Sequence, residues 1–344
     1  MVLKCMKITV VSIQMGKILL IISLFLTTNL LSKEVKIIEP TYVYTASGAV
    51  TDIVSSEDKI YVATDASCVD VFDLKTKNLI QKIKVSKIKD FMGDEIDAKI
   101  YNVDIYKNKV LLTAQAKKGF REIHIYQNGK LTTAISTDKR MFISKAKFID
   151  EEHILFSLLG NEMYLYNYKT KKMLWRIDVR PNDAVFNSTF SDFVLNEDKT
   201  IAVVADESGD LKLVDIKKAE VIKVLKGQNL DKVFKVDFKN NIIITAGQDG
   251  RCVVYNLETN KDYFIRKKDW FLIYGAGLSP SGKLGAFSSD ENNNVTVFNT
   301  KSQDNLFKLT KNIMTLSSIL FINDDELFVT TDSNKFNYYN LKDK

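Results

Sequence analysis

Three aspartates recur at comparable places in successive stretches of predicted strand. They are Asp52, Asp104 and Asp237, and each lies on or beside the first strand of a repeating unit. Carboxylate oxygens are the ligands that Ca²⁺ prefers in proteins. If these strands surround a common channel, the carboxylates could hold a cation there and support metal-assisted hydrolysis. The alternative is that each carboxylate accepts hydrogen bonds from nearby backbone N–H groups, which requires no ligand.

Other residues that could carry chemistry are sparse. Neither His124 nor His153 has a second histidine or a cysteine at ligand spacing. No C-x-x-C-H, G-x-S-x-G, P-loop or dinucleotide-binding motif occurs, which argues against covalent haem and the matching enzyme classes. We expect Cys68 and Cys252 to be buried apolar fillers. The sequence therefore predicts no catalytic residue, no resident metal and no cofactor.

The elements that must position these residues come from an internal repeat. One polar residue follows a strand in every unit, and these anchors are Asp73, Gln127, Asn167, Asp215, Asn256, Asn299 and Asn340. Their separations along the chain are 54, 40, 48, 41, 43 and 41 residues. Strand-rich units that recur about every 40–45 residues are typical of propeller blades. The spacing predicts an all-β chain folded as a seven-bladed β-propeller.

Residues 242–257 (IIITAGQDGRCVVYNL) show the pattern within one unit. A β-branched strand leads into a turn formed by Gly247, Asp249 and Gly250, and a second strand follows. The last unit has three strands where the others have four. We expect residues 42–46 near the N-terminus to supply its fourth strand, because this closes the ring and removes an exposed sheet edge.

Two units resemble the WD40-type propeller family. Gln248-Asp249-Gly250, followed by Asn256-Leu257-Glu258-Thr259, is similar to the turn and tail of that family, and residues 277–283 (GLSPSGK) are similar to its SPDGK turn. The Trp-Asp and Gly-His pairs of the family are absent. The resemblance covers about residues 35–344 and implies a WD40/YVTN-like seven-bladed propeller.

The first 32 residues have the layout of a secretory signal peptide. Residues 15–17 (Met-Gly-Lys) open a basic region, residues 18–26 are apolar and residues 27–32 form a polar exit. We expect cleavage after Ser32, with Met15 as an alternative start, and one propeller domain over residues 33–344. The expected location is the bacterial periplasm. An uncleaved inner-membrane anchor is the alternative, and membrane contact is expected only in that case.

Charge argues against a nucleic-acid partner. Of the six net positive charges, three (Lys4, Lys7 and Lys17) lie before residue 33, so the predicted propeller carries only three. A nucleic-acid-binding domain usually shows a strong basic excess on one face.

An exported, degenerate seven-bladed propeller rich in Lys and Asn also resembles one narrower family. Its layout and composition are similar to those of the accessory protein encoded with the periplasmic nitrate reductase of epsilonproteobacteria. This resemblance implies a role beside a redox complex. It carries over no functional residue.

Long separations between anchors locate insertions at residues 85–99 and 178–191, with a shorter extension at 117–121. In a propeller these connections emerge on the same face. Aromatic, Met and Arg side chains there suit a protein interface. The candidate partner-binding residues are Phe91, Met92, Phe120, Arg121, Arg180, Phe186 and Phe190. The alternative is that these loops fold back onto the blades.

The leading hypothesis is an exported, monomeric, non-catalytic propeller that binds another periplasmic protein or complex. Subunits of a nitrate reductase are the named candidate partner. One alternative is a Ca²⁺-dependent, lactonase-like hydrolase with its site in the channel. A further alternative is an anchored propeller that assists outer-membrane assembly.

Overall fold

The computed structural model describes residues 35–180, 187–266 and 271–343. The predicted export segment, residues 1–32, lies outside the described residues. Strands dominate the described part, and helix is confined there to two single 3₁₀ turns, η1 (Lys117–Gly119) and η2 (Thr137–Lys139). No helix of the described chain is long and apolar enough to span a membrane. Residues Ile37–Lys344 pack as one compact unit.

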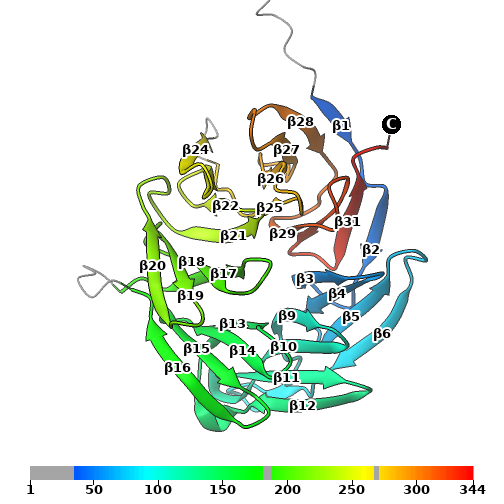
Figure 1. Ribbon diagram of the computed structural model, residues 1–344. Helices are drawn as coiled ribbons and strands as arrows, with labels where there is room; N and C mark the ends of the chain where they lie inside the picture. Colours follow the sequence, from blue (N-terminus) through cyan, green and yellow to red (C-terminus); the bar gives the residue numbers. More distant parts are fainter. Residues whose placement is uncertain (1–34, 181–186, 267–270, 344) are drawn as a thin grey trace, which may run out of the picture. The chain divides into compact units, whose positions relative to one another are not determined.

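Seven antiparallel sheets surround a common axis and form the blades of a propeller (Figure 1). In each blade the first strand is innermost, and the first strands of neighbouring blades contact one another around the axis. Blade one contains β3 (Val50–Ser56), β4 (Lys59–Thr64), β5 (Cys68–Asp73) and β6 (Leu79–Lys84). Blade two contains β9 (Ile100–Tyr106), β10 (Lys109–Gln115), β11 (Arg121–Gln127) and β12 (Lys130–Ile135). Blade three contains β13 (Ile143–Phe148), β14 (His153–Leu158), β15 (Glu162–Asn167) and β16 (Lys172–Asp178).

The remaining four blades repeat this arrangement. Blade four contains β17 (Phe190–Leu195), β18 (Ile201–Asp206), β19 (Leu211–Asp215) and β20 (Glu220–Leu225). Blade five contains β21 (Val233–Lys239), β22 (Ile242–Gly247), β23 (Arg251–Asn256) and β24 (Lys261–Arg266). Blade six contains β25 (Ala276–Leu278), β26 (Leu284–Ser288), β27 (Val295–Asn299) and β28 (Asn305–Leu309). Blade seven contains β29 (Leu316–Phe321), β30 (Glu326–Thr331) and β31 (Lys335–Asn340), together with an N-terminal strand.

That N-terminal strand, β2 (Tyr42–Thr45), closes the ring as predicted. It pairs antiparallel with β31, with Tyr42 opposite Tyr338. The Tyr44 side chain is buried and stacks on Phe336, with ring centroids 5.1 Å apart. A second N-terminal strand was not predicted: β1 (Lys36–Ile38) lies beside β28 and makes blade six five-stranded. The first described strands, β1 and β2, and the last, β31, therefore lie in one pair of neighbouring blades.

The repeated polar anchors form the turns between third and fourth strands. Asn256 Oδ1 accepts hydrogen bonds from the backbone N–H groups of Glu258 and Thr259, at 3.0 and 2.9 Å. Equivalent bonds are made by Asp73, Asn167, Asp215 and Asn299. Gln127 of blade two differs, because a two-residue hairpin loop with positive φ (Asn128-Gly129) follows it. The polar residue therefore recurs in the sequence because these turns need a side-chain acceptor for their backbone N–H groups.

The apolar core is divided among the interfaces between blades. Seven buried clusters occur, and each joins residues of two neighbouring blades, including the pair formed by blades seven and one. Second strands such as β18 and β22 are buried almost throughout, as expected for strands covered on both sides. Cys68 and Cys252 are buried free thiols, as predicted.

Candidate functional site

Successive strands of a blade run antiparallel, so their connections fall on two faces. Loops from second to third strands share one face with loops from the fourth strand to the next blade, and we call this the loop face. Its described connections include residues 85–99, 116–120, 136–142, 159–161, 226–232 and 310–315. The opposite face, formed by the remaining turns, is called the turn face.

A small hairpin projects from the loop face between blades one and two. It consists of β7 (Ile88–Lys89) and β8 (Glu95–Ile96), and its tip carries Phe91 and Met92. Their side chains are 96% and 72% exposed. The tip is nevertheless ordered, because Asp90 Oδ1 accepts the backbone N–H groups of Met92 (2.8 Å) and Asp94 (2.9 Å).

The hairpin is fixed to the two blades beneath it. Ser67 Oγ of blade one accepts the Ala98 backbone N–H at 2.7 Å and donates to Asp97 Oδ1 at 3.0 Å. The Gln115 backbone N–H of blade two donates to the Lys99 carbonyl at 2.8 Å. Phe91 is therefore presented by a braced element.

Phe120 and Arg121 lie together on blade two, where the sequence placed them. The half-buried Phe120 ring packs against Phe142, with centroids 5.0 Å apart. The Arg121 guanidinium lies 3.6 Å above the Tyr101 ring, and its Nη1 donates to the Ile143 carbonyl at 2.8 Å. Burial lowers the pKa of Arg121, although arginine stays charged at neutral pH. These two residues brace the loop face more than they protrude from it.

The predictions for residues 178–191 hold only in part. Phe190 was expected to be exposed, and this was wrong: it is the first residue of β17, is 4% exposed and packs beside Phe193. Arg180 is partly exposed, and its guanidinium pairs with the Asp178 carboxylate and donates a hydrogen bond to Asn187 Oδ1. Phe186 lies outside the described residues.

Further apolar side chains project from the loop face in positions that loop length did not indicate. They are Phe142, Leu159, Leu230, Ile313 and Met314, of which Leu230 is 66% and Ile313 59% exposed. Among the described residues, the turn-face connections hold no large apolar side chain of comparable exposure. The apolar positions thus extend around the loop face to the junction of blades six and seven, beyond blades one to four, which carry the predicted insertions at residues 85–99, 117–121 and 178–191.

The channel is the second candidate region. Asp52, Asp104 and Asp237 do lie on first strands, together with Asp192, which sequence inspection missed. Each carboxylate accepts a backbone N–H from the next blade. The donors are Val103 to Asp52, Phe148 to Asp104, Val236 to Asp192 and Leu278 to Asp237, at 2.8–3.2 Å. These acids accept backbone N–H groups, as the ligand-free alternative predicted, and the bonds also join neighbouring blades.

Lysines of blade three neutralise two of these carboxylates. Lys145 Nζ lies 2.5 Å from Asp192, and Lys147 Nζ lies 3.2 Å from Asp104. Burial disfavours the Asp192 carboxylate, but Lys145 and Lys235 outweigh it and hold its pKa below the ordinary value. Burial likewise disfavours the Lys147 ammonium, yet Asp104 and Asp52 hold its pKa above the ordinary value. Asp192 and Lys147 are therefore charged at neutral pH.

The same arrangement argues against the channel acids as a cation site. Apart from Asp52 Oδ1, their oxygens already face amide and ammonium donors, which compete with a Ca²⁺ ion for the same lone pairs. Among residues 35–180, 187–266 and 271–343, no group of three or more Asp, Glu, His or Cys side chains is placed to hold a metal ion. The histidines serve local contacts: His153 pairs with Asp150 at 2.8 Å, and His124 with Thr133 at 3.1 Å.

Comparison with known proteins identifies the fold. No protein-family model matches this chain, and neither does any curated protein. Among solved structures, the chain is similar to the β-propeller domain of Cps50 (Swd1) from Myceliophteria thermophila, with a TM-score of 0.72 and 12% identity. The match covers 87% of this chain and 99% of that chain. At this identity the similarity shows the seven-bladed propeller fold alone.

Proposed function

We propose that this protein is a non-catalytic propeller that binds another protein through its loop face. The observation that carries the proposal is the asymmetry of exposed apolar side chains between the two faces. In the described connections, Phe91, Met92, Leu230 and Ile313 project from the loop face, while the turn face has no counterpart. Exposed apolar groups rimmed by polar residues mark interaction sites on soluble proteins.

The braced hairpin supports Phe91 as the principal anchor. Aromatic side chains that enter a partner's pocket carry much of the binding energy of protein interfaces. Burying one exposed Phe side chain contributes about 1.5–3 kcal/mol. Because Asp90 already orders the tip, little conformational entropy is lost when the partner binds.

The cellular location and the kind of partner are inferred from the sequence. We infer from the signal-peptide layout of residues 1–32 that the protein is exported to the periplasm. Similarity in layout and composition favours an accessory or assembly role, and the nitrate reductase system is the first candidate. In this assignment the propeller acts as a monomer and its partner is a periplasmic redox enzyme or one of its subunits.

Affinity capture from periplasmic extract, followed by quantitative mass spectrometry, tests the proposal. The test variant is Phe91→Ser/Met92→Ser, and the matched control is Leu79→Ser/Ile80→Ser on β6. Both pairs are exposed, but only the first lies on the loop face. We expect one stoichiometric protein with wild type and control, and its loss with the hairpin variant. Equal recovery with all three proteins would contradict the proposed face.

A further inference from the structure

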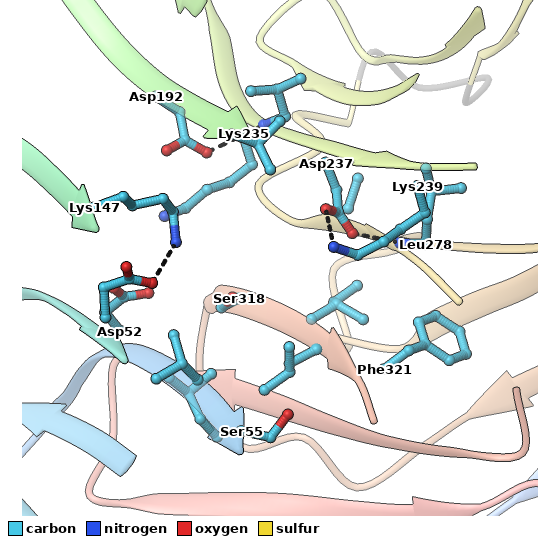
Figure 2. Close-up of a pocket in the computed structure, with 18 of the residues that line it drawn as sticks. Asp52, Ser55, Lys147, Asp192, Lys235, Asp237, Lys239, Leu278, Ser318 and Phe321 are labelled. Carbon is cyan, nitrogen blue, oxygen red and sulfur yellow. Dashed lines mark hydrogen bonds and ion pairs between the residues drawn. The ribbon is translucent and has the colours of Figure 1, made fainter. Parts of the chain in front are cut away.

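A cavity of about 500 Å³ occupies the axial channel (Figure 2). Besides the first strands, its lining includes Glu197 and Pro280, which belong to turns between first and second strands. The cavity therefore opens on the turn face, away from the loop face. Its volume falls within the range of small-molecule sites, about 300–1,000 Å³.

One sector of this cavity is cationic. Lys145 and Lys147 of blade three and Lys235 of blade five line it, and Figure 2 shows Lys147 and Lys235 directed into the same space. Lys145 and Lys147 each use one N–H on a channel carboxylate. The Lys235 ammonium makes no hydrogen bond or ion pair with any residue that the structure describes, although its charge acts on Asp192.

The unused hydrogen-bonding capacity of this sector consists mainly of donors. An ammonium group carries three N–H donors. The acceptors are largely occupied: Asp192 Oδ1 receives Lys145 and the Phe193 backbone N–H, and its Oδ2 receives Val236. The Oδ1 atom of Asp52 is the exception, because the hydrogen bonds that Asp52 accepts from described residues all go to its Oδ2 atom. A ligand that complements the sector must bring acceptor oxygens.

The opposite sector of the cavity is mainly apolar, with Ser55 and Ser318 as its uncharged polar groups. Leu320 of blade seven and Val54 of blade one line it and are only partly buried, and the largely buried Phe321 of blade seven also borders it. Blades seven and one lie across the ring from blades three to five (Figure 1). A ligand that fills the cavity therefore meets cations at one end and hydrocarbon at the other.

The fixed charges limit the charge of such a ligand. The lining holds the three lysines together with Lys239, and it holds one more carboxylate than lysine: Asp52, Asp104, Asp192, Glu197 and Asp237. Asp237 faces Lys239 at 3.9 Å, and Glu197 accepts the Asn240 backbone N–H at 2.7 Å. A single negative charge can use the spare donors of the cationic sector, whereas each further charge of a di- or trianion would face the carboxylates.

We propose that the channel binds a small organic monocarboxylate, with its carboxylate on Lys235 and its hydrocarbon part against Leu320 and Val54. The proposal is independent of the docking function, since the cavity opens on the other face. Ligand and protein partner can therefore bind at the same time.

Isothermal titration of the full-length protein with hexanoate tests this site. Three comparison probes each change one property of hexanoate. Acetate lacks the long hydrocarbon part, hexylamine carries a positive charge in place of the negative one, and inorganic phosphate carries more than one negative charge near neutral pH. We expect hexanoate to bind at least ten-fold more tightly than each of these. Absence of hexanoate binding, or equal binding of hexylamine, would overturn the proposal.

Variants locate the bound probe. Lys235→Met should weaken hexanoate binding at least ten-fold, Leu320→Asn should weaken it several-fold, and Lys235→Arg should retain it. Lys311→Met on the loop face is the matched control and should bind as wild type does. A thermal melt checks that each variant is folded. We expect the Lys235 variants to fold, because the Lys235 side chain has no bonded partner in the described chain. Unchanged binding by folded Lys235→Met would refute the assignment.

Discussion

The Asp104 carboxylate of blade two holds two groups of blade three. Its Oδ1 lies 3.2 Å from Lys147 Nζ, and its Oδ2 accepts the Phe148 backbone N–H at 2.8 Å. One carboxylate therefore satisfies a backbone donor at the blade junction and neutralises a buried ammonium. A channel acid that resembles a metal ligand in the sequence thus has a structural task.

Calcium should not stabilise this protein. The channel carboxylates accept backbone and lysine donors, so a Ca²⁺ ion would have to displace bonds already made. We expect the same melting temperature in millimolar Ca²⁺ and in a chelator, and no heat in a calorimetric titration. Saturable Ca²⁺ binding that Asp52→Asn or Asp237→Asn abolishes would restore the hydrolase alternative.

Removing one partner of a buried ion pair in blade four should cost far more stability than removing one partner of a surface pair. Lys212 Nζ lies 2.7 Å from Asp206 Oδ2, and both side chains are almost fully buried. Lys212→Met leaves a buried carboxylate without its cation, so we expect a loss of about 3–5 kcal/mol in urea unfolding. Lys311→Met, which removes an exposed partner of Glu39, is the control and should cost less than about 1 kcal/mol. Similar losses in both variants would contradict this difference.

The same pair should make stability depend on acid pH. Burial opposes ionisation of Asp206, but Lys212 and Ser208 outweigh it and hold its pKa below the ordinary value. The unfolded chain, with an Asp pKa of about 3.9, then binds protons before the folded protein does. The stability that this group contributes is therefore fully present above the unfolded-state pKa, and it is lost as the pH falls through the lower pKa of the folded protein. Urea midpoints measured between about pH 6 and 2 should therefore fall less steeply for Asp206→Asn/Lys212→Met than for wild type. Identical slopes would be evidence against the ionised pair.

Ring closure by β2 should depend on Tyr44. Its ring is buried against Phe336 and lies 5.3 Å from Phe72 of blade one, so it joins the first and last blades. Tyr44→Ala should lower the free energy of unfolding by about 3–5 kcal/mol, as for other buried aromatic residues. The neighbouring Val43 is exposed, and Val43→Ala should change stability by less than about 0.5 kcal/mol. A small loss for Tyr44→Ala would show that closure relies on other contacts.

The fold could be predicted from the sequence because its repeat is chemical and local. Asp73, Asn256 and their counterparts recur because each accepts the same backbone N–H groups in a turn. The β1 strand could not be predicted in the same way. It has three residues, and its partner β28 lies more than 260 residues away in the chain.

The candidate site was less predictable, because loop length is a poor measure of exposure. Phe91 lies in a long insertion and is exposed, whereas Phe190 lies at the end of another and begins a buried strand. Leu230 and Ile313 occupy loops of ordinary length, and only the assembled ring shows that they share a face with Phe91. The channel lysines were missed because their pairing partners belong to neighbouring blades.

The most direct test of the docking account is the affinity of the purified partner for the hairpin variant. We predict that Phe91→Ser/Met92→Ser raises Kd at least about 30-fold, which corresponds to about 2 kcal/mol of interface energy. Leu79→Ser/Ile80→Ser should bind with the wild-type Kd. A hairpin variant that binds as tightly as wild type, while the β6 variant loses affinity, would show that the partner docks on the outer strands and not on the loop face.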